Sequence, residues 1–132
     1  MAALDTNVLL RFLLQDDAVQ SAAASRLVRA ANATGDTLYV PVSVTLELEW
    51  VLRSRFKMGK AAVLQTFFSL LETTELRFEG TSALEWALNQ YEESAADFSD
   101  CLHAALASMA FEQPFWTFDK TAATLHGAAL LA

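Results

Sequence analysis

The sequence is short of cysteine and of long apolar runs, and each shortage removes a class of protein. Its single cysteine, Cys101, excludes an internal disulfide and a metal site built on paired cysteines. No apolar run reaches the roughly 18 residues that a transmembrane helix needs. The N-terminal residues lack the basic segment of a secretory signal, and Asp5 interrupts the apolar stretch there. We therefore expect a cytoplasmic protein with no membrane segment.

Basic residues are also scarce: nine Lys and Arg stand against sixteen Asp and Glu, giving a formal net charge of −7. Because phosphate contacts normally use cations, this balance argues mildly against nucleic acid as a partner. A cluster of carboxylates around a divalent metal would account for part of the excess. Four cations nevertheless form a basic cluster: Arg53, Arg55, Lys57 and Lys60. This cluster is either a track for phosphates or a solvated helix end, and we favour the helix end because cations suit it electrostatically.

The chain has no internal repeat, linker or low-complexity segment, and we expect a single domain over residues 1–132. Short β-prone runs alternate with stretches of helical periodicity, a pattern typical of a parallel sheet covered by helices. The expected strands are 2–4, 38–40, 75–78 and 115–118. The apolar tail after Gly127 is either a fifth edge strand or frayed.

The helical stretches add two specific expectations. The helices at 44–56 and 63–71 are adjacent in the chain and rich in Trp and Phe, so they should form an αα-hairpin. Another helix precedes the turn that begins at Asn32, and a last helix should cover 120–126. The apolar residues at helical spacing before Asn32 should form a buried stripe; they are Val19, Ala22, Ala23, Leu27 and Ala30.

Two expected strands end on an aspartate, Asp5 and Asp119. The C-terminal ends of parallel strands share one edge of the sheet, and open α/β sheets bind ligands there. Glu47 and Asp100 lie in the early turns of helices, which begin where strands finish, so both can reach the same edge. Asp5 has a second interpretation as the N-cap of the helix that follows. On position alone both interpretations stay open.

Four carboxylates held together in a crevice raise one another's pKa, and a divalent cation removes that repulsion. Mg²⁺ prefers oxygen ligands, and the two histidines are isolated, so nothing favours a softer metal. His103, one turn after Asp100, is either a catalytic base or ligand or a partly buried histidine with an ordinary hydrogen bond, and we favour the partly buried histidine. Such acidic sites suit phosphodiester hydrolysis, in which a metal activates water and a free carboxylate orients or deprotonates it.

The chain resembles a PIN-domain protein of the VapC toxin type over essentially its whole length. Four segments carry the resemblance: LDTNVL at 4–9, LELEWVL at 46–52, DFSDCLH at 97–103 and TFDK at 117–120. The resemblance implies a PIN-like three-layer α/β fold whose short central parallel sheet of four to five strands is flanked by helices. The family's acidic quartet corresponds to Asp5, Glu47, Asp100 and Asp119, the same four acids reached by position.

The resemblance further implies an endoribonuclease that depends on Mg²⁺ or Mn²⁺ and cuts structured RNA as the toxin of a type II toxin–antitoxin pair. All four acids would be catalytic, with Asp5 and Asp100 as metal ligands. Further residues would orient ligands or water: Thr6, Asn7, Asp97 and Thr117. The implied partners are a small VapB-like antitoxin, whose C-terminal segment blocks the site, and a second copy in a homodimer. Arg11 and the basic cluster are candidate contacts for RNA or antitoxin.

Two alternatives remain on the sequence alone. The chain is either a catalytically silent PIN fold that serves as a binding module, or a metal-dependent phosphohydrolase acting on another substrate. The intact quartet argues against the silent module, since such a protein has no need for four mutually repelling acids. Asn7 stands where phosphoaspartate enzymes carry their second aspartate, which argues against a covalent aspartyl-phosphate route.

Overall fold

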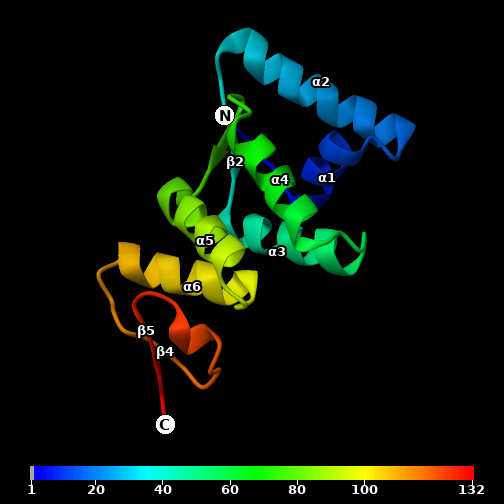
Figure 1. Ribbon diagram of the computed structural model, residues 1–132. Helices are drawn as coiled ribbons and strands as arrows, with labels where there is room; N and C mark the ends of the chain where they lie inside the picture. The colour runs from blue at the N-terminus through cyan, green and yellow to red at the C-terminus, as the bar shows by residue number, and fades with distance from the viewer. Residues whose placement is uncertain (1) are drawn as a thin grey trace. The chain divides into compact units, whose positions relative to one another are not determined.

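The computed structural model describes residues 2–132, so Met1 of the expected domain lies outside the described residues. Helices and parallel strands alternate along the chain, which confirms the α/β class (Figure 1). The chain divides into two compact units, one that extends to Glu79 and one that covers Gly80–Ala132. We call them unit 1 and unit 2 and describe each by itself.

Unit 1 is built on a three-stranded parallel sheet in the order β1-β2-β3. In its register Ala2 lies opposite Leu38, and Leu38 lies opposite Leu76. Parallel neighbours require crossover connections, and helices supply them here. The elements of unit 1 are β1 (Ala2–Ala3), α1 (Thr6–Leu14), α2 (Ala18–Thr34), β2 (Leu38–Val40), α3 (Val42–Ser54), α4 (Lys60–Leu71) and β3 (Leu76–Phe78).

The αα-hairpin is confirmed, because α3 and α4 pack against each other. Phe67 of α4 is completely buried, as are Leu48 and Leu52 of α3, so these side chains belong to the core. Trp50 lies on the opposite side of α3 and is 58% exposed. The hairpin therefore combines a packed inner face with an aromatic side chain at the surface.

The expected buried stripe of α2 is wrong. Val19 is 78% exposed and Leu27 is 39% exposed, and the three alanines of the expected stripe are exposed as well. The side chains that α2 buries, where it packs against α1, are Ser21, Ala24, Val28 and Ala31. This helix carries small apolar residues on both sides, so hydrophobic periodicity could not identify the buried one. An apolar surface on α2 consequently faces solvent.

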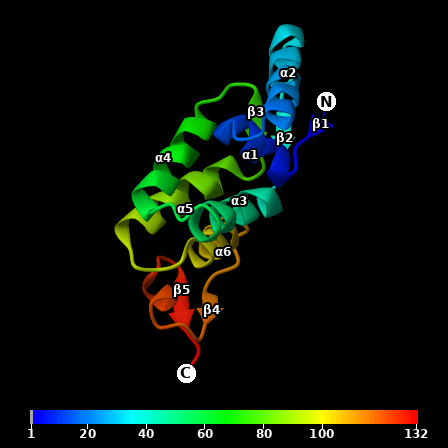
Figure 2. The same ribbon diagram turned by 90° about the vertical axis from the view of Figure 1, so that its right-hand side faces the viewer.

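Unit 2 consists of two packed helices and a two-stranded parallel sheet (Figure 2). Its core includes a T-shaped contact between Tyr91 and Phe98, whose ring centroids are 5.6 Å apart. Phe115 lies opposite Ala128 in the register of the sheet. The elements of unit 2 are α5 (Thr81–Glu93), α6 (Phe98–Met109), β4 (Phe115–Thr117), a 3-10 helix η1 (Ala122–Thr124) and β5 (Ala128–Leu130).

Two expectations for the C-terminal part need correction. The helix expected at 120–126 is only the single turn η1, because the short connection from Asp119 to β5 leaves no room for more. The tail does form a fifth strand, but hydrogen bonds divide the five strands into sheets of three and two instead of joining them in one. Within the described residues 2–132, no helix is both long and apolar enough to cross a membrane.

Candidate active site

Asp5 is the N-cap of α1, and its Oδ1 accepts a hydrogen bond of 2.9 Å from the backbone N–H of Val8. The capping interpretation is therefore confirmed. A carboxylate has two oxygens and several lone pairs, so a cap does not exclude a second role. Asp5 is exposed, whereas Leu4 before it and Thr6 after it are buried. The buried neighbours on both sides hold the backbone of Asp5 in place, and its carboxylate lies at the surface.

Glu47 is held by Thr6, which donates a hydrogen bond from its Oγ1 to Glu47 Oε1. Thr6 is only 6% exposed, and Glu47 is exposed. The bond joins the start of α1 to α3 across 41 residues of sequence. Unit 1 therefore carries two of the four predicted acids, Asp5 beside Thr6 in the chain and Glu47 in contact with it.

The other acid of this helix has a structural role. Glu49 is 3% exposed and forms an ion pair of 2.9 Å with Nε of Arg53, one helical turn later. This confirms that Glu47 and Glu49 face different directions, as their spacing on a helix requires. The ion pair also engages one of the four residues of the basic cluster.

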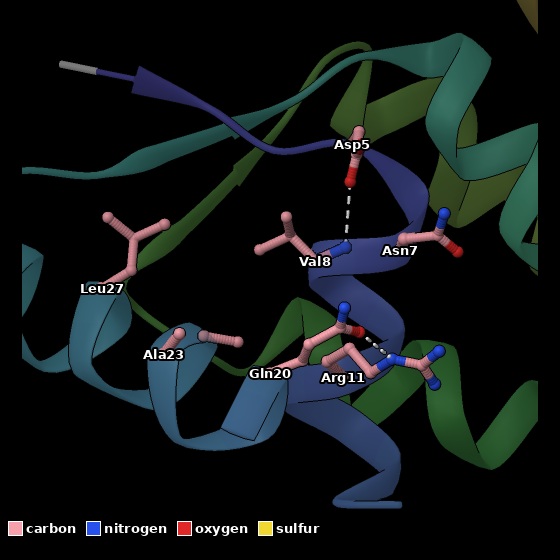
Figure 3. A pocket seen from close by; sticks show the side chains of 8 residues that line it. Asp5, Asn7, Val8, Arg11, Gln20, Ala23 and Leu27 are labelled. Carbon is pink, nitrogen blue, oxygen red and sulfur yellow. Dashed lines mark hydrogen bonds between the residues drawn. The ribbon is translucent and has the colours of Figure 1, made fainter. Parts of the chain in front are cut away.

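A groove of about 330 Å³ runs between α1 and α2 beside Asp5 (Figure 3). Arg11 is fixed along it, because its Nη1 lies 2.9 Å from Asp16 Oδ1 and its Nε donates to Gln20 Oε1 at 2.7 Å. Figure 3 shows the hydrogen bond between Arg11 and Gln20 together with the apolar side chains Ala23 and Leu27 of α2. The lining residues are Asp5, Asn7, Val8, Arg11, Gln20, Ala23, Ala24 and Leu27.

In unit 2, Asp119 repeats the local geometry of Asp5. It follows β4, and its Oδ1 accepts a hydrogen bond of 2.9 Å from Ala122 N, three residues later. Its own N–H donates to Thr117 Oγ1 at 3.0 Å, so Thr117 fixes the turn that carries this carboxylate. Asp5 and Asp119 are thus strand-end carboxylates with the same kind of support.

Asp100 lies in the first turn of α6, and its pKa is raised above the ordinary value. Burial is the largest cause, and the negative charges of Asp119 and Asp97 add to it, whereas His103 lowers the pKa. Three carboxylates of unit 2 therefore influence one another electrostatically. Asp97 occupies the N-cap position of α6 without a side-chain capping bond.

His103 is exposed, so the expectation of a partly buried histidine is wrong. It lies one turn after Asp100, on the side of α6 that faces away from the buried Cys101 and Leu102. Its ring centroid is 6.0 Å from that of Phe115. Its place in the site is beside Asp100, whose pKa it lowers.

The other three residues of the basic cluster surround the turn between α3 and α4. The guanidinium of Arg55 lies over the ring of Phe56, 5.8 Å from its centroid. Lys57 has a left-handed backbone with φ of 57°, and Lys60 is the first residue of α4. This placement agrees with a helix end, and a contact with RNA or antitoxin stays a prediction.

The donor set of the predicted quartet fits a hard divalent cation, because all four side chains offer carboxylate oxygens. Asp5 and Glu47 belong to unit 1, and Asp100 and Asp119 belong to unit 2. Over residues 2–132, no group of three or more His, Cys, Asp or Glu side chains is arranged to hold a metal ion. The assembly of one site from the two pairs stays a prediction.

Sequence reasoning missed two exposed aromatic side chains beside Asp119. Trp116 is 57% exposed and Phe118 is 77% exposed. Residues 115–118 are aromatic at three of four positions, so no alternation of apolar and polar residues marks the outer face. Their position next to a strand-end aspartate was the available signal.

Comparison with known proteins identifies the family. A family model described as PIN domain matches residues 2–125, a span that includes all four predicted acids. No curated protein matches the chain. The PIN domain is a nuclease-type fold, and its members are typically metal-dependent hydrolases. Since the match covers nearly the whole chain, the protein belongs to the PIN domain family.

Proposed function

We propose that this protein is an endoribonuclease that depends on Mg²⁺ or Mn²⁺, hydrolyses phosphodiester bonds of structured RNA and acts as the toxin of a type II toxin–antitoxin pair. The observation that carries the proposal is the family match, because it spans every position of the acidic quartet. The supported carboxylates Asp5, Glu47 and Asp119 add to it, since each is fixed by a hydrogen bond and remains exposed.

In this proposal Asp5 and Asp100 hold the divalent ion. When bound, such an ion activates a water molecule and stabilises the leaving oxygen of the cleaved bond. Glu47 orients the attacking water and accepts its proton at Oε2, because Oε1 is engaged by Thr6. The negative charge of Asp119 raises the pKa of Asp100, so a nearby cation would relieve the repulsion between these two carboxylates.

Cleavage of RNA by matched aspartate variants tests the proposal. Asp5 and Asp17 are both N-caps whose side chains accept a 2.9 Å bond from the N–H three residues later. Asparagine keeps this capping ability and removes the charge. We expect Asp5→Asn to abolish cleavage in Mn²⁺ and Asp17→Asn to retain it. Equal cleavage by both variants would contradict the proposal.

The groove between α1 and α2 supports the proposed antitoxin, because a segment bound there would cover Asp5.

The exposed side chains Val19 and Trp50 support a homodimer, since they offer apolar surface to a second copy. Sedimentation velocity of Val19→Lys and Trp50→Lys tests the dimer, with Gln65→Lys at an exposed position of α4 as the control. Only the first two should weaken self-association.

A further inference from the structure

Trp116 and Phe118 form an exposed aromatic pair that ends directly before Asp119. Both rings are exposed, whereas Phe115 and Thr117 are half-buried. Trp116 is the middle residue of β4, and Phe118 follows the strand in the bend that leads to Asp119. The aromatic pair therefore continues the surface that carries Asp119.

Unit 2 leaves few other means of holding RNA. Between Gly80 and Ala132 the sequence contains seven Asp and Glu residues and a single Lys, Lys120. That cation directly follows Asp119 and is exposed. One cation cannot neutralise many phosphates, so the contribution of unit 2 to RNA affinity must come from another source. Aromatic side chains supply it, because bases stack on them regardless of charge or base identity.

We propose that Trp116 and Phe118 each stack one unpaired base beside the bond that is cut, with Lys120 contacting the phosphate nearby. The inference rests on the proposed ribonuclease function and names its substrate as an unpaired segment of RNA. A base can stack on a side-chain ring only where its own face is uncovered, and in a duplex neighbouring bases cover each other's faces. A loop or a free end provides such bases, and a paired stem does not.

Fluorescence anisotropy with metal-free protein tests the proposal without cleavage. The probes are a short fluorescein-labelled single-stranded oligoribonucleotide and its duplex. We expect wild type to prefer the single strand, and Trp116→Ala and Phe118→Ala each to weaken that binding roughly 5- to 150-fold. The ring-retaining changes Trp116→Phe and Phe118→Tyr should recover most of it. Phe111→Ala is the matched control, because Phe111 is 93% exposed and follows the opposite end of α6 from Asp100.

The double alanine variant carries both Trp116→Ala and Phe118→Ala. Preference of wild type for the duplex, or unchanged single-strand binding by the double alanine variant, would overturn the proposal. So would unchanged RNA binding combined with lost self-association, because the pair would then be a protein interface. Melting temperatures equal to that of wild type confirm that the exposed substitutions leave the fold intact. Cleavage in Mn²⁺ separates the two proposals: binding without cleavage refutes the nuclease, and full cleavage by the double alanine variant refutes the stacking.

Discussion

Thr6 donates its hydroxyl hydrogen to Oε1 of Glu47, and this bond joins the residue after Asp5 to the acid on α3. The two ends differ in environment, because Thr6 is buried among the first residues of α1 and Glu47 is exposed. A buried donor with few rotamers available holds an exposed carboxylate in one orientation. Unit 1 therefore fixes Asp5 and Glu47 through consecutive residues of a single helix start.

Thr6→Val should separate this positioning role from stability. The change keeps the shape of the side chain and removes the hydroxyl. Water can replace the lost donor at the exposed Glu47, so the free energy of unfolding should change by no more than about 1 kcal/mol. Side chains that orient the groups around a metal typically contribute about 10- to 100-fold to activity, so the cleavage rate at saturating Mn²⁺ should fall by about that factor. Thr6→Ser, which restores the hydroxyl, should cleave RNA like wild type; equal cleavage rates for all three proteins would contradict the role.

Glu47→Gln and Glu49→Gln form a pair of variants on one helix with opposite expected results. Glu49 is buried against Arg53, so its neutralisation removes a charge-assisted hydrogen bond and should lower stability by about 1–3 kcal/mol. Glu47→Gln should leave stability nearly unchanged and abolish cleavage, because an amide cannot accept the proton of water. Urea denaturation and an RNA cleavage assay measure the two effects. Loss of cleavage in the folded Glu49→Gln variant alone would reverse the assignment.

Asp100→Asn should raise the stability of the metal-free protein at neutral pH. The folded protein raises the pKa of Asp100, through burial first and through Asp119 and Asp97 as well. The protonated form is therefore favoured by folding: its stabilisation is fully present below the ordinary pKa of about 3.9 and is lost as pH rises through the raised value. The variant should melt at a higher temperature than wild type at pH 7, and the difference should shrink toward pH 4. A lower melting temperature at pH 7 would contradict this.

Local sequence signals predicted much of the fold because they act within a few residues. The run at 38–40 is apolar, β-prone and closed by a proline, and it forms β2 as expected. Asp5 caps α1, which is one of the two interpretations that its side-chain chemistry allowed. The α2 stripe failed for a different reason. Alanines are spread around most of the circumference of α2, so only tertiary packing decides which side is buried.

The candidate site, too, was predictable from the sequence only where the signals are local. The sequence placed each acid correctly at a strand end or in an early helical turn, because those positions follow from local order. It did not show that Glu47 is held by Thr6, since a contact across 41 residues has no local signal. It also missed the exposure of Trp116 and Phe118, because a segment with aromatic residues at three of its four positions does not indicate its outer face.

Metal-dependent melting tests the proposed metal ligands Asp5 and Asp100. A ligand that binds only the native state at a hundredfold excess over its Kd adds about 2.7 kcal/mol, which corresponds to roughly 10 °C for a chain of this size. We expect wild type and Asp17→Asn to gain such a shift in Mn²⁺. Asp5→Asn and Asp100→Asn should each lose it completely, because the proposed function makes both carboxylates ligands of the same ion. If each variant kept half of the shift in melting temperature, Asp5 and Asp100 would belong to two independent metal sites. If wild type neither shifted nor cleaved RNA, the proposed function as a metal-dependent nuclease would be refuted.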